Sequence, residues 1–132
     1  MDKLALRVFP YTKDISGQYF PVVPLVLKYK HRKIDTDALI DSGATFSVFQ
    51  PAIADYLGIK IDSGKKIILG GVGGKIKGYL HKLNINVSDK IFVCPVVFSR
   101  EYLVSFNLLG RKNVFEKFRI IFDEKKRVVE LI

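Results

Sequence analysis

Short apolar runs separated by polar turn signals recur along the whole chain. Several of them alternate apolar and polar residues, which is the period of a half-buried strand, and others are brief continuous runs of β-branched and aromatic residues. The pattern predicts strands at residues 4–9, 22–30, 34–40, 65–69, 75–80, 83–87, 91–98, 119–122 and 127–131. A polar loop is expected at 10–17 and a turn at 31–33, and Pro24 predicts an edge or a bulge in the second strand.

Two segments have the character of short helices. Residues 50–57 carry Pro51 near the first turn and are followed by Gly58, which is a typical helix stop. Residues 113–118 follow Gly110 and form the second candidate.

These elements predict a mainly β fold in one domain, residues 1–132. A chain of this length buries a core without help from metals or disulfides. Many short strands leave many free edges, and a closed or nearly closed β-barrel removes most of them. We therefore expect a β-barrel with two short helices and a projecting hairpin.

The formal net charge is +9, which is compatible with a nucleic-acid-binding protein. However, the Lys and Arg residues are scattered over predicted turns and strand ends, which favours solvated hairpin tips. A basic barrel that binds single strands by stacking is a second reading, and it would use the aromatic residues Tyr19, Phe20, Tyr29 and Tyr79. It accounts for none of the motifs described below, so no nucleic-acid partner is expected. The charge also favours acidic substrates or partners.

The single cysteine, Cys94, lies in an apolar run and is expected to be a buried thiol of a reducing compartment. His31, His81 and Cys94 lack metal-ligand spacing, so we expect no metal and no cofactor. No apolar run is long enough to span a membrane, and no leader is visible at the start of the chain. The expected location is the cytoplasm.

The first motif is an Asp-Ser-Gly-Ala sequence, residues 41–44, at the end of an apolar strand. An Asp-Ser-Gly triplet alone is usually a simple turn, and a second one occurs at Asp62. The apolar run before Asp41 and Ala44 after it would hold this acid in a fairly dry place, where its protonation is tunable. Asp62 instead has lysines around it, which indicates an exposed turn.

The second motif is the glycine cluster at 70–74, which has Val72 at its centre. A phosphate-binding loop would need a Lys followed by Ser or Thr and then a helix, whereas Lys75 is followed by a strand pattern. A mobile hairpin that closes over a ligand fits better. The third motif is Asn-Leu-Leu-Gly-Arg at 107–111, where a glycine allows two strands to pass closely.

In this order and at these spacings, the three motifs resemble the retropepsin family of aspartic proteases over roughly residues 20–131. The resemblance implies an acid-protease-type barrel with a flap hairpin and a catalytic carboxylate at Asp41. It implies that Ser42 braces the site across a two-fold axis, that Gly43 allows close approach, and that Ala44 lines the substrate cleft. The family's flap tip maps to Gly70, Gly71, Val72, Gly73 and Gly74, with Val72 touching substrate or partner flap. Its loop beneath the site maps to Leu108, Leu109 and Gly110.

The chain departs from the viral pattern after the first motif. Viral enzymes usually carry an acid just after the Ala, and it pairs with the Arg that follows the downstream glycine. Those acidic positions are Thr45 and Phe46 here, so Arg111 is expected to lack its usual partner. The added C-terminal hairpin also suggests a dimer interface that differs from the viral one.

An aspartic protease needs two carboxyl groups that share a proton, one as general base and one as general acid. Asp37 is four residues from Asp41 on the same strand, about 13 Å away, and Asp62 has the surroundings of an exposed turn. The second acid should therefore come from an identical subunit. We expect an obligate homodimer that hydrolyses peptide or protein substrates; the alternative is an inactive peptide-binding or dimerisation module with the same fold.

Overall fold

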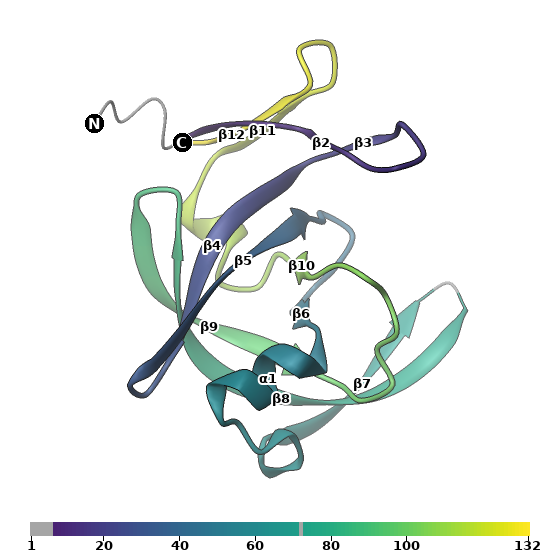
Figure 1. Ribbon diagram of the computed structural model, residues 1–132, viewed down its shortest axis with the longest axis vertical. Coiled ribbons are helices and arrows are strands. Elements are labelled where there is room, and N and C mark those ends of the chain that lie inside the picture. Colours follow the sequence, from purple (N-terminus) through teal and green to yellow (C-terminus); the bar gives the residue numbers. More distant parts are fainter. Residues whose placement is uncertain (1–6, 72) are drawn as a thin grey trace.

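The computed structural model describes residues 7–71 and 73–132, and strands dominate it (Figure 1). The strands are β1 (Val8–Pro10), β2 (Thr12–Lys13), β3 (Tyr19–Phe20), β4 (Val22–Tyr29), β5 (Arg32–Ile40), β6 (Ser47–Phe49), β7 (Lys65–Gly71), β8 (Gly74–Val87), β9 (Lys90–Phe98), β10 (Leu108–Leu109), β11 (Ile120–Asp123) and β12 (Val128–Leu131). The helical elements are α1 (Pro51–Leu57) and the 3₁₀ turns η2 (Ile61–Ser63) and η3 (Phe115–Lys117).

Seven strands form one sheet in the order β4-β5-β10-β6-β9-β8-β7, and β8 also pairs with β4. That extra pairing closes six of the strands into a circuit and leaves β7 outside it, as the partner of β8 in a projecting hairpin (Figure 1). The expected mainly β fold with a closed barrel and a hairpin is confirmed.

Strand alternation fills the barrel. Val23, Leu25 and Leu27 of β4 are buried, as are Leu83 and Ile85 of β8, while the residues between them are more exposed. The same period runs through β5 and β9, so the apolar faces of the strands meet in one core.

β8 corrects one of the predictions. Residues 75–80 and 83–87 were expected as separate strands, but they are two parts of one strand of 14 residues. Its first half pairs with β7 and its second half with β4, while β9 pairs with it from Tyr79 to Val87. The polar pair at positions 81 and 82 looks like a break in the sequence, although the alternation continues through it.

The two predicted helices fare differently. α1 is confirmed at 51–57; Gly58 ends it in the left-handed conformation at φ 76°. The helix expected at 113–118 is only the three-residue turn η3. Asn113 has φ 63°, which a helix cannot accommodate, and it leaves too few residues for a regular turn.

Smaller differences concern the turns and the N-terminal region. The β4–β5 turn is Lys30–His31, one residue earlier than expected, and Lys30 takes φ 55° there. The segment expected to be a loop at 10–17 contains β2, which pairs with β3. Of the strand expected at 4–9, residues 4–6 lie outside the described residues. Pro24 lies where β4 has only β5 as its neighbour, as an edge position requires.

A separate sheet in the order β1-β12-β11 brings the first strand and the last two strands together at one end of the molecule (Figure 1). Tyr11 is buried beside it; its N–H donates to the carbonyl oxygen of Arg127 at 2.8 Å, and its hydroxyl donates to Oε1 of Glu124 at 2.9 Å. Among the described residues, the structure contains no helix of sufficient length and apolar character to cross a membrane.

The Tyr11–Glu124 bond predicts a fall in stability at alkaline pH. Burial, then the bond to Glu124 and its charge, raise the pKa of Tyr11 to about 12, from about 10 in the unfolded chain. A raised pKa means that the folded state keeps the proton longer, so this contribution is complete below pH 10 and is lost between pH 10 and 12. The free energy of unfolding, measured with urea, should fall less steeply across this pH range for Tyr11→Phe than for wild type. Equal slopes would show that the tyrosine does not titrate differently in the two states.

Candidate active site

Asp41 lies at the end of β5, in a turn held by its own side chain. Its Oδ1 accepts the N–H of Gly43 at 2.9 Å, and its carbonyl oxygen accepts the N–H of Ala44 at 3.2 Å. Its own N–H donates to the carbonyl oxygen of Leu109 at 3.0 Å. Asp41 is half-buried while Ser42 and Gly43 are exposed, so in a single chain the carboxylate is drier on one side only.

The third motif lies directly beneath this turn. Leu108 and Leu109 form β10, which runs parallel to β5 and antiparallel to β6. The segment expected to be a loop is therefore a short strand at this point, because both of its neighbours offer main-chain partners. The first and third motifs, whose nearest residues are 63 positions apart in sequence, meet here through main-chain bonds.

Gly110 explains why the approach is so close. A Cβ at this position would overlap the main-chain oxygen of Phe46 and press on that of Ala44. Its N–H donates to Oγ of Ser47, a fully buried hydroxyl, at 3.1 Å. On the next residue, the N–H of Arg111 donates to the carbonyl oxygen of Ala44 at 2.9 Å. The Asp41 turn is thus fixed from below by main-chain bonds together with the buried hydroxyl of Ser47.

Among the described residues Arg111 has no acidic partner, as expected, and it contacts a neighbouring hydroxyl instead. Its guanidinium donates to Oγ1 of Thr45 at 3.4 Å, so the threonine hydroxyl takes the place of the missing acid. The bond is long, and both residues are exposed. A neutral, solvent-exposed partner at this distance holds the arginine weakly.

The glycine motif forms the tip of the β7–β8 hairpin. Gly71 pairs with Gly74, and Gly73 and Gly74 take φ of 116° and 119°, which side-chain-bearing residues rarely adopt. At Gly70, Gly71, Gly73 and Gly74 an added Cβ would meet nothing within 4 Å. Among the described residues, the tip therefore stands clear of the rest of the chain. Val72 lies outside the described residues.

The base of this hairpin packs on a small apolar cluster near the Asp41 turn. Val48, Val97 and Tyr102 form its buried part, and partly buried side chains of the hairpin and of the Asp41 turn pack against it: Phe46, Ile67, Leu69, Ile76 and Leu80. Burial, and then the charge of Asp41, raise the pKa of Tyr102 to about 12. The hairpin, β6 and the segment before β10 thus share one apolar contact beside the catalytic candidate.

Tyr102 and Asn107 are site-supporting residues that sequence reasoning did not assign. The Tyr102 hydroxyl donates to the carbonyl oxygen of Phe106 at 2.7 Å, which closes the exposed loop between them. Asn107 is buried; its Oδ1 accepts the N–H of Gln50 and its Nδ2 donates to the carbonyl oxygen of Asp37, both at 2.9 Å. Polar residues beside an apolar strand carry no sequence signal that distinguishes such a clamp from a solvated turn.

The other chemical candidates have structural explanations. Asp62 belongs to η2 and is exposed, and Gly64 is pressed against Leu80 and His81, whose ring bonds the carbonyl oxygen of Ile61 at 2.7 Å. Burial raises the pKa of the Cys94 thiol to about 11, so it is a poor nucleophile. Within the described part of the chain, no group of three His, Cys, Asp or Glu side chains could hold a metal ion.

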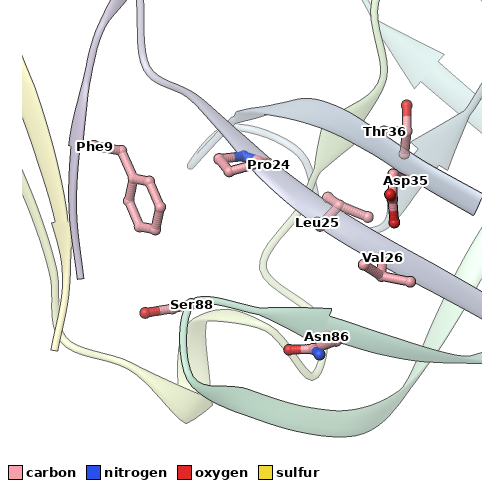
Figure 2. Close-up of a pocket in the computed structure, with 8 residues that line it drawn as sticks. All are labelled: Phe9, Pro24, Leu25, Val26, Asp35, Thr36, Asn86 and Ser88. Atoms are coloured by element: carbon pink, nitrogen blue, oxygen red, sulfur yellow. The ribbon is translucent and has the colours of Figure 1, made fainter. Parts of the chain in front are cut away.

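Among the pockets on the surface of the described residues, two are well formed, and Asp41 lines neither of these two. One lies between β1, β4 and the β8–β9 turn, with Phe9, Pro24 and Ser88 around it, as Figure 2 shows. The other borders the outer face of β5 and includes Leu39, two residues before Asp41.

Comparison with known proteins identifies the class. A family model described as aspartyl protease matches residues 27–112, about two-thirds of the chain, and the chain belongs to this family. It is 37% identical over 86 residues to Protein DDI1 homolog 1 of Caenorhabditis elegans; the match covers 59% of this chain and 22% of that protein. The chain therefore spans only about a fifth of the length of this relative.

Two solved structures share the fold. A retropepsin-like aspartic protease from Rickettsia conorii matches with a TM-score of 0.70 at 16% identity, over 94% of this chain and 87% of that one. The EIAV protease, solved in complex with the inhibitor HBY-793, matches with a TM-score of 0.57 at 19% identity, over 80% and 91% of the two chains. The retropepsin-like fold indicated by the three motifs is confirmed.

The close approach at Gly110 predicts that Gly110→Ala is strongly destabilising. The added methyl group would push on main-chain atoms that cannot rotate away. The free energy of unfolding should therefore fall by about 1–3 kcal/mol or more, the usual range for overpacking. Urea unfolding measures the loss. Gly70→Ala is the matched control, because nothing lies within 4 Å of its Cβ and it should cost less than about 1 kcal/mol. Equal losses in both variants would contradict the role given to Gly110.

Proposed function

We propose that the chain is an aspartic endopeptidase that acts as a homodimer, with Asp41 of each copy forming the catalytic pair. The observation that carries the proposal is the position of Asp41: it ends β5, its turn is tied to β10 by main-chain bonds, and the glycine hairpin stands beside it. Membership of the aspartyl protease family and the retropepsin-like fold support the same reading.

The need for two copies follows from the chemistry of one carboxylate. Asp41 is the acid of this motif, and Asp37, four residues earlier on the same strand, is about 13 Å away. Two carboxyl groups can share a proton only within a few ångströms of each other. A two-fold axis beside Asp41 would bring the second copy's Asp41 into that range. The half-open surroundings of Asp41 in one chain agree with a cleft completed by a partner.

In such a pair one carboxylate is ionised and the other is protonated. The ionised one takes a proton from water as the water oxygen attacks the peptide carbonyl carbon, and the protonated one gives its proton to the carbonyl oxygen. The tetrahedral intermediate then collapses: the C–N bond breaks, the nitrogen receives a proton from one carboxyl group, and the other takes a proton from a hydroxyl group. The dyad returns to its singly protonated state.

The remaining motif residues have supporting roles in this proposal. Ser42, exposed beside Asp41, would bond across the axis to brace the two turns, and Gly43 and Ala44 would line the cleft. Gly70, Gly71, Val72, Gly73 and Gly74 would close over an extended peptide, with Leu108, Leu109 and Gly110 fixing the floor. The free main-chain groups of such a peptide would pair in the manner of an added strand. The lone buried thiol is consistent with action in the cytoplasm.

Cleavage of a peptide mixture from a denatured proteome, read by mass spectrometry from acid to neutral pH, tests the assignment. Asp41→Asn should lower the rate by roughly 10²- to 10⁴-fold or more, because it removes the acid–base pair. Asp62→Asn is the matched control, since it alters the same triplet in an exposed turn and should leave the rate unchanged. No cleavage by folded, dimeric wild-type protein would favour a binding or assembly module instead.

Subunit mixing tests the shared site. When wild type and Asp41→Asn exchange subunits in equal amounts, only about one quarter of the dimers should carry two aspartates, so activity per wild-type chain should fall by about half. The readout is the cleavage rate of one peptide after equilibration, with Asp62→Asn as the mixing control. Activity that stays proportional to the wild-type chains alone, or that survives dilution to monomer, would contradict a site built from two copies.

A further inference from the structure

The second pocket has mixed walls, apolar along its length and acidic at two points. Its volume is about 310 Å³. It is built by the β2–β3 hairpin, the paired strands β4 and β5, and the loop before β10, and the side chains that matter here are Asp14, Phe20, Val22, Asp37, Leu39 and Phe106. Val22 and Leu39 are direct partners across the two strands, which makes the floor continuous.

This pocket lies on the same face of β5 as Asp41. Side chains alternate along a strand: Ala38 and Ile40 are buried in the barrel, so Asp37 and Leu39 point to the other side, as does Asp41. The spacing places Leu39 about 7 Å and Asp37 about 13 Å from Asp41 along the strand. An extended peptide has the same repeat. These separations equal the span of two to four residues of an extended peptide, so a side chain at that distance from a bond held at Asp41 can reach the pocket.

In the part of the chain that the structure describes, the two carboxylates of the pocket have no cationic partner. Within the described residues the ion pairs are Arg7–Asp89 and Arg100–Asp55. Asp37 is exposed, and its side chain makes no hydrogen bond or ion pair in this part of the chain. This is notable in a chain with a net charge of +9, in which cations are abundant.

Asp14 is fixed and ionised in place. Its Oδ1 accepts the hydroxyl and the N–H of Ser16, at 2.7 and 2.9 Å, and the N–H of Gln18 at 2.9 Å. These bonds, the hydroxyl of Ser16 first, lower the pKa of Asp14. They all use one oxygen, which leaves Oδ2 for a ligand. Two cations close by in the sequence or structure contact an aromatic ring instead. The Lys13 ammonium and the Arg127 guanidinium lie over the ring of Tyr19, at 5.8 and 3.9 Å from its centroid.

We infer that this pocket is a specificity site for a lysine or arginine side chain of the substrate, two to four residues from the cleaved bond. The inference rests on the proposed function. The aliphatic stem of the residue would lie along Val22, Leu39 and Phe106, and its charged end would reach Asp37 and Asp14. A purely apolar side chain would leave both carboxylates without a partner, and an acidic one would be repelled.

The test compares peptides that carry lysine or norleucine at each position around the cleaved bond, since norleucine keeps the stem and removes the charge. Wild type should prefer lysine at one position by about three- to tenfold in kcat/KM, a range set by partly exposed charge pairs. Asp37→Asn should lower kcat/KM for the lysine peptide to near that of the norleucine peptide, whose own kcat/KM should change much less. Asp35→Asn is the matched control: it is the same residue type on the same strand, exposed, but it lines the other pocket, as Figure 2 shows.

A second measurement separates this inference from the proposed function. Calorimetric titration of the same peptides into Asp41→Asn protein measures binding without cleavage. Cleavage with no lysine preference, or with a preference that survives Asp37→Asn, would overturn the pocket's role and leave the protease intact. Tighter binding of the lysine peptide, lost in Asp37→Asn, would support the pocket even if wild type cleaved nothing. Neither cleavage nor peptide binding would overturn both.

Discussion

The main-chain contact between the strand β10 and the turn that carries Asp41 is the constraint on which the site depends. β10 is two residues long, yet it joins β5 to β6 and so completes the circuit of six strands. The absence of a side chain at Gly110 allows the chain to pass beneath Ala44 and Phe46. The N–H of Asp41 and the buried hydroxyl of Ser47 are satisfied in the same place. One glycine thus serves both barrel closure and the orientation of the carboxylate.

The same barrel extends into the glycine hairpin because β8 belongs to both. Its C-terminal half pairs with β4 and β9 inside the circuit, and its N-terminal half pairs with β7 outside it. The hairpin is therefore anchored at its base by continuous main-chain bonds and by the cluster around Val48 and Tyr102. The described residues of its tip are glycines, and among the described residues nothing lies within 4 Å of the Cβ positions built on them. A rigid base with a free tip is the arrangement that a closing lid needs, because motion is confined to the end that would meet a ligand.

Local signals in the sequence predicted most of this architecture. The strand ending in Asp41, the glycine tip, the helix ending at Gly58 and the last hairpin all depend on short-range patterns. The errors depend on tertiary contacts. β8 is continuous because its two halves have different neighbours. The element η3 is short because Asn113 takes a positive φ. The clamp at Asn107 could not be predicted, since its partner is a main-chain atom distant in sequence. The closure of the Tyr102 loop could not be predicted either, because the sequence around its main-chain partner has the character of an exposed segment.

The distribution of charge shows why net charge is a poor guide to what this protein recognises. A net charge of +9 suggests an acidic ligand. However, salt screens the attraction between exposed charges beyond about 10 Å, so the local charges decide what is bound. The charged residues that line the pocket beside β5 are Asp14 and Asp37, while Lys13 and Arg127 lie over the ring of Tyr19. The general positive field and the local carboxylates then act at different ranges. In the proposed protease, the field would favour the approach of a substrate, and the pocket would select the side chain that is held beside β5.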